Sequence, residues 1–187
     1  IFEVPTAENY VRQGVTTLVE GQDGSSPLPL GAFLAKVAAL RPAVNFASLV
    51  GHGSVREAVM GRADRAPSAA ELARMEGLVR EAMREGAFGL STGLFYVPGT
   101  FAPTDEVIAL ARVAGEMGGI HGSHMRDEAA GVVESRGSDI RRLHRQQRDR
   151  EDRAGSVRPV RAHEARIDPG QEGSAPPDRP DDRPVGQ

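Results

Sequence analysis

The sequence contains no cysteine in its 187 residues. This absence excludes a disulfide scaffold, a zinc ribbon and a thiol nucleophile. No segment approaches the run of about 18 apolar residues that spans a bilayer, and the chain does not open with a basic and then apolar leader. We therefore expect a soluble, cytoplasmic protein without a membrane partner, long enough for one domain with a substantial core.

Several short motifs are absent as well. Neither GxGxxG nor GxxxxGKS/T follows a predicted strand, which disfavours nucleotide binding. The paired-histidine motifs HxH and HExxH are also missing. Motif rules alone therefore do not establish a metal centre.

Charge and apolar content change near Ser135. Residues 1–135 carry 10 Arg and one Lys against 16 acidic residues, whereas residues 136–187 carry 12 Arg against 10 acidic residues. This second segment has only 10 Ala, Val, Ile or Leu residues and no aromatic residue. It cannot bury enough apolar surface to offset its ordering entropy. We therefore expect a globular part at 1–135 and a disordered Arg/Asp/Pro-rich tail at 136–187, which is either native or an out-of-frame reading of GC-rich DNA.

Strand and helix patterns alternate through residues 1–135. Short apolar or β-branched runs predict strands at 15–19, 44–50, 87–90 and 120–123. Apolar residues at helical spacing predict helices at 7–13 and 31–40, after Ser54, from Ser68 to Gly86, and from Thr104 to Gly118. Ser68 and Glu71 have the spacing of a capping box, and Thr104 is the predicted cap of the next helix. This alternation predicts a parallel sheet with crossover helices, either doubly wound or a (β/α) barrel.

Polar residues follow all four predicted strands. They are Gln22 and Asp23; His52; Ser91, Thr92 and Tyr96; and the run from His124 to Glu128. In either fold the chemistry belongs on the loops that follow the C-terminal ends of the strands. This distribution indicates an enzyme.

Each candidate also has a structural interpretation. His124 at a strand end suits a metal ligand, because a neighbouring carboxylate fixes its tautomer, but it also suits a half-buried structural residue. Asp23 lies in a turn, where an aspartate needs no further role. The glycines beside His52 permit close approach of a substrate or simply a turn. Tyr96 either covers a pocket or packs its own loop.

Four segments together resemble a known family. They are NYVRQGVTT at 9–17, GHGSVR at 51–56, GAFGLSTGLFYVP at 86–98 and SHMRDE at 123–128. This set resembles the N-acyl-D-amino-acid deacylases (D-aminoacylases), which are metal-dependent amidohydrolases, over about residues 1–135. The resemblance implies an α/β fold that is part of a (β/α)8 TIM-type barrel.

The resemblance also implies a chemistry and roles for single residues. In the family, zinc activates a water that attacks the amide carbonyl of an N-acyl-D-amino acid. His124 matches a metal-ligand histidine, and Asp23 stands where many members carry a ligating cysteine; a carboxylate suits a harder metal. His52, Ser91, Tyr96 and Arg126 match loops around the substrate.

Other parts of the family's site have no counterpart in this sequence. The HxH pair, a later ligand histidine and the catalytic aspartate are unmatched, so we expect the isolated chain to be inactive. Two other interpretations stay open: a non-catalytic α/β interaction protein with a charged tail, and a nucleic-acid-associated protein acting through the tail. The second is disfavoured because the 12 Arg of the tail are balanced by 10 acidic residues.

Overall fold

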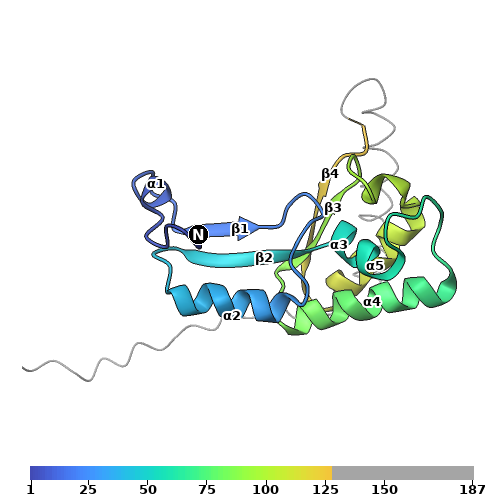
Figure 1. Ribbon diagram of the computed structural model, residues 1–187, viewed down its shortest axis with the longest axis horizontal. Coiled ribbons are helices and arrows are strands. Elements are labelled where there is room, and N and C mark those ends of the chain that lie inside the picture. Colours follow the sequence, from blue (N-terminus) through green and yellow to red (C-terminus); the bar gives the residue numbers. More distant parts are fainter. Residues whose placement is uncertain (128–187) are drawn as a thin grey trace, which may run out of the picture.

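The computed structural model describes residues 1–127, so the predicted tail at 136–187 lies outside the described residues (Figure 1). Its four strands are β1 (Thr17–Glu20), β2 (Asn45–Gly51), β3 (Gly89–Gly93) and β4 (Ile120–His124). The helices are α1 (Glu8–Val11), α2 (Leu30–Leu40), α3 (His52–Met60), α4 (Ala69–Arg84) and α5 (Thr104–Glu116), with a short 3-10 helix η1 (Gly99–Phe101) before α5.

The order of the strands identifies the type of α/β fold. All pairings are parallel, and the strands lie in the order β1-β2-β3-β4 without reversal. A doubly wound sheet has a point where the strand order reverses, whereas a barrel adds its strands in sequence. Figure 1 shows β3 and β4 turned steeply against β1 and β2, so that the sheet curls. The described residues therefore form part of a (β/α) barrel, as predicted.

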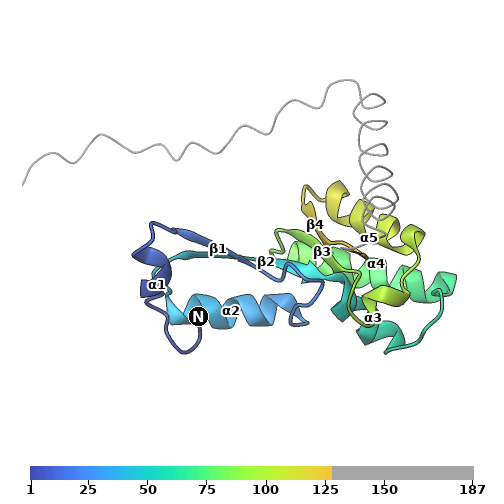
Figure 2. The same ribbon diagram turned by 90° about the horizontal axis from the view of Figure 1, so that it is seen from above.

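The core lies between the curled sheet and its crossover helices. Val50 of β2 and Leu90 of β3 are register partners and fully buried. They share one apolar cluster with Met75 and Val79 of α4 and with Leu110 of α5. Both views show α2 running alongside β1 and β2, with α4 further along the molecule (Figures 1 and 2). This packing fixes the sheet edge on which the functional loops sit.

Element ends differ slightly from the predictions. The capping box of α4 is present: the Ser68 side chain accepts from the Glu71 N–H, and the Glu71 carboxylate accepts from the Ser68 N–H. Thr104, however, is the first residue of α5 rather than its cap, because Pro103 occupies the N-cap position. Within residues 1–127, no helix is both long and apolar enough to cross a membrane.

Candidate functional site

Two sequence-predicted metal ligands meet at the C-terminal edge of the sheet. Asp23 lies in the loop after β1, and His124 is the last residue of β4. Their side chains approach each other, with Asp23 Oδ1 3.4 Å from His124 Nδ1. The two residues are 101 positions apart in sequence, so only the curl of the sheet brings them together.

Aromatic rings flank His124 on two sides. The Tyr96 ring meets the imidazole edge-on at a centroid distance of 5.0 Å, and the Phe95 ring is stacked on it at 6.2 Å. Phe95 and Tyr96 are 59% and 46% exposed, respectively. The same rings that hold His124 therefore still offer apolar surface to a ligand beside it.

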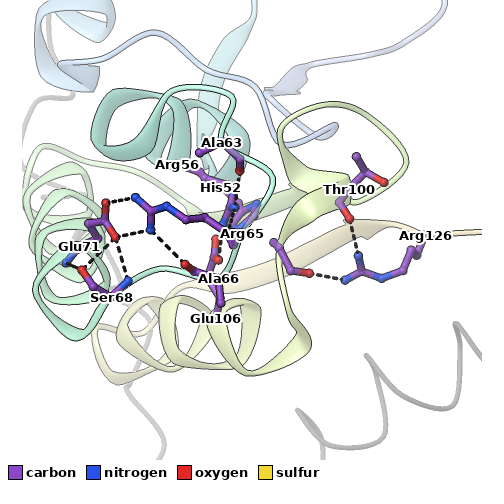
Figure 3. A network of polar contacts seen from close by, with 11 residues as sticks. His52, Arg56, Ala63, Arg65, Ala66, Ser68, Glu71, Thr100, Glu106 and Arg126 are labelled. Atoms are coloured by element: carbon purple, nitrogen blue, oxygen red, sulfur yellow. Dashed lines mark hydrogen bonds and ion pairs between the residues drawn. The ribbon is translucent and has the colours of Figure 1, made fainter.

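Ser91 and Arg126 hold the loops of this edge. Ser91 is fully buried in β3, and its Oγ accepts a hydrogen bond of 3.1 Å from the N–H of Gly24. Arg126 donates from Nη1 to the Thr100 carbonyl and from Nη2 to the Ala102 carbonyl, at 3.2 and 3.0 Å (Figure 3). Both residues thus fix the loops that carry Asp23 and Tyr96. Direct contact of either with a substrate stays a prediction.

Ser91 also lies in a segment with the letters of a hydrolase motif. Residues Gly89–Gly93 read GLSTG, which fits GxSxG. That motif places its serine on a strained turn between strand and helix, with Oγ exposed. Here the serine is in the middle of a strand, and its buried Oγ is bonded to the Gly24 backbone. The geometry does not fit a nucleophilic serine.

His52 follows β2 at the same edge, as predicted, but its side chain is turned into the helix layer. Its Nε2 lies 2.8 Å from Oε1 of Glu106, in the first turn of α5. The other carboxylate oxygen of Glu106 accepts from Nη1 of Arg56, one turn further along α3. All three side chains are fully buried, and Figure 3 shows them lying together. The His52 side chain therefore faces Glu106 in the helix layer, and its contact with a substrate stays a prediction.

The ionisation of Glu106 reflects these partners. Burial by itself raises the pKa of a carboxyl group. Here the hydrogen bonds from His52 and Arg56, together with their charges, outweigh burial and hold the pKa of Glu106 below its ordinary value. Glu106 is therefore a buried carboxylate with a structural partner on each oxygen.

Asp23 and His124 have the chemistry and spacing of partners in a metal site. Two ligands about 2.0–2.1 Å from a tetrahedral zinc lie about 3.3 Å apart, which is close to the 3.4 Å between Oδ1 and Nδ1. A catalytic zinc generally has about three protein ligands, and residues 1–127 contain no cluster of three His, Cys, Asp or Glu side chains placed to hold a metal. The pair fits a metal ion as part of a ligand set.

Sequence reasoning missed Glu106, Arg56 and Phe95. An acidic residue in the first turn of a helix is ordinary, so Glu106 gave no signal. The spacing of four between His52 and Arg56 puts both on one face of α3, which was the available clue. Phe95 belongs to the same motif segment as Tyr96, but nothing in its spacing indicates stacking on an imidazole.

Comparison with known proteins bears on this site. No protein-family model matches the chain. The chain is 40% identical over 147 aligned residues to the N-acyl-D-aspartate deacylase of Alcaligenes xylosoxydans xylosoxydans, a match covering 66% of this chain and 30% of that protein.

Solved structures agree with the sequence match. A D-aminoacylase with a binuclear metal centre superposes with a TM-score of 0.67 at 34% identity, covering 73% of this chain and 33% of that one. The N-acyl-D-glutamate deacylase of Bordetella bronchiseptica, solved with zinc and a phosphonate mimic of the tetrahedral intermediate, gives a TM-score of 0.66 at 33% identity over 82% of this chain and 42% of that one. The resemblance to N-acyl-D-amino-acid deacylases is confirmed, and the chain spans 30% to 42% of the length of these relatives.

Proposed function

We propose that this chain supplies part of the active site of a metal-dependent deacylase that cleaves the amide bond of N-acyl-D-amino acids. The observation that carries the proposal is the pairing of Asp23 with His124 at 3.4 Å, at the C-terminal edge of a partial barrel. Barrel enzymes place their chemistry at this edge. A relative by sequence is an N-acyl-D-aspartate deacylase, and a relative by structure is an N-acyl-D-glutamate deacylase.

Each residue of the site has a distinct part in this proposal. Asp23 and His124 would hold the metal, which when bound lowers the pKa of a water and polarises the amide carbonyl. The exposed faces of Phe95 and Tyr96 bind the apolar part of the substrate and exclude water beside His124. Arg126 keeps the loop of the two aromatic residues in place through its carbonyl contacts.

A chimeric enzyme tests the proposal. The matching segment of the N-acyl-D-aspartate deacylase is replaced by residues 1–127 of this chain, and release of D-aspartate from N-acetyl-D-aspartate is assayed with and without added Zn²⁺ or Mn²⁺. We expect metal-dependent turnover that falls at least about 100-fold with His124→Ala, because a metal ligand is lost.

The control is Glu81→Gln, an exposed position on α4, which should leave turnover within about twofold. A folded chimera without metal-dependent turnover would contradict the proposal. Turnover that His124→Ala does not change would contradict it as well.

A further inference from the structure

We propose that the buried cluster of His52, Arg56 and Glu106, the ion cluster, positions the loop that carries Asp23. The three residues are positioning residues and do not touch the reacting atoms. The importance of Asp23 rests on the proposed function, but the mechanical link from the ion cluster to the loop is independent of it.

The ion cluster first fixes the start of α3. His52 and Arg56 lie one turn apart on α3, and Glu106 of α5 accepts from both. Arg56 also donates from Nη2 to the carbonyls of Ala63 and Arg65, at 3.1 and 2.7 Å, so the segment after α3 is tied to the same side chain (Figure 3). The first two turns of α3 are thereby joined to α5 and to the α3–α4 connection.

The first turn of α3 then holds the loop after β1. The N–H of Ser54 donates to the Gly24 carbonyl at 3.3 Å, and the Ser54 Oγ accepts from the Ser26 N–H at 2.9 Å. The Ser26 Oγ in turn accepts from the N–H of Gly51, directly before α3, at 2.9 Å. Three hydrogen bonds therefore connect residues 24–26 to residues 51–54.

Close backbone packing gives this loop little room to adjust. Gly24 has a φ of +74°, and a Cβ there would collide with the Gly93 backbone. A Cβ on Gly51 would lie 2.6 Å from the Gly24 carbonyl carbon, and one on Gly53 would lie 2.8 Å from the Gly24 carbonyl oxygen. Because backbone touches backbone, a displaced α3 N-terminus must displace the loop as well.

The Asp23 side chain depends on this support. It is 67% exposed, whereas its partner His124 is 19% exposed and anchored between two aromatic rings. An exposed side chain takes its position mainly from its backbone. The 3.4 Å spacing of the two metal-ligand candidates therefore depends on the ion cluster, through α3 and Ser54.

Amide hydrogen exchange of the full 187-residue chain, measured by NMR, tests the link. The probes are the N–H groups of Gly24 and Ser26, and the reference is the N–H of Val79 in the core of α4. In Glu106→Gln we expect protection of both probes to fall at least tenfold relative to the reference. Glu81→Gln is the matched control, since it removes an exposed carboxylate of α4 that belongs neither to the ion cluster nor to the Arg65–Glu71 contacts, and it should leave the ratio unchanged.

A second pair of variants covers the case in which Glu106→Gln does not fold. Ser54→Ala removes the hydroxyl between α3 and the loop, and Arg56→Lys keeps the charge but loses the forked contacts of the guanidinium. Both should lower the protection of Gly24 and Ser26 relative to Val79.

Equal loss of protection at the two probes and at Val79 would overturn the proposal. Loss of protection at the probes in Ser54→Ala but not in Arg56→Lys would overturn it as well. The chimera assay tests the proposed function, whereas hydrogen exchange tests only the link from the ion cluster to the loop. Either proposal can therefore be contradicted without the other.

Discussion

At the scale of single residues, Glu106 links α5 to α3 through its contacts with His52 and Arg56. It places a carboxylate in the buried interior, where it is tolerated because each oxygen has a cationic or imidazole partner. Removal of one partner from such a buried cluster leaves an uncompensated charge, which typically destabilises a protein by about 3–5 kcal/mol. Conversion of the whole cluster to apolar residues would be far less harmful by the same argument.

We therefore predict that Glu106→Gln lowers the free energy of unfolding by about 3–5 kcal/mol at pH 7. The effect should depend on pH. The folded-state pKa of Glu106 lies below the ordinary 4.5, so its stabilisation is complete above about pH 4.5 and is lost as the pH falls through the lowered pKa. Urea denaturation of both proteins between pH 7 and pH 3 checks this. A difference between wild type and variant that stays constant down to pH 3 would contradict the assignment.

At the scale of elements, the N-terminus of α4 has a capping box, which the sequence alone predicts. Ser68 and Glu71 form the reciprocal capping box, and Arg65 donates two hydrogen bonds to the Glu71 carboxylate, at 2.8 and 2.6 Å. The hydrogen bonds from Arg65 and Ser68 hold the pKa of Glu71 well below its usual range. The helix therefore begins at a defined residue, although its first turn is exposed.

Ser68→Ala should lower the free energy of unfolding by about 0.5–2 kcal/mol, since the Glu71 N–H loses its acceptor. We expect the urea midpoint to fall while the dependence on urea concentration stays the same, because the surface exposed on unfolding does not change. Ser68→Asp, which keeps a capping oxygen, is the control and should retain most of the stability. A Ser68→Ala variant as stable as wild type would show that the Arg65–Glu71 contact alone defines the helix start.

Most elements were predictable because their signals are local. The β-branched run at 15–19 and the apolar stripe of α4 produced a strand and a helix within two residues of the observed ends. Strand β1 begins at Thr17 because its hydrogen-bonded pairing with β2 starts at Thr17 and Asn45. The residues of a strand do not reveal where its partner strand begins to pair. The sequence also did not distinguish a barrel from a doubly wound sheet, because the order of the strands depends on contacts between residues far apart in sequence.

The site was predictable only in part for the same physical reason. Asp23, Tyr96 and His124 follow strands, and parallel strands bring their ends to one edge, so their meeting follows from topology. The direction of His52 depends instead on Glu106, 54 residues away on another helix. Periodicity carries no information about such a pairing.

At the scale of the whole molecule, the described sheet is open. Within residues 1–127, β1 and β4 each pair with one neighbour, whereas a closed barrel leaves no strand at an edge. A metal site at the C-terminal rim of a barrel draws ligands from several strands around the ring. The described part of the rim provides two candidate donors from β1 and β4, which lie at opposite ends of the sheet.

The number of side chains available to bind zinc therefore predicts the metal content of the 187-residue chain. A catalytic zinc generally needs about three protein ligands and a water. Within residues 1–127, Asp23 and His124 supply two, His52 is paired with Glu106, and the whole sequence has no HxH pair. We expect the purified chain, dialysed and analysed by mass spectrometry, to hold well under one zinc per chain and to release no D-amino acid from N-acetyl-D-amino acids. His124→Ala should give the same two values. Stoichiometric zinc with turnover above that variant would instead demonstrate a complete ligand set within this chain.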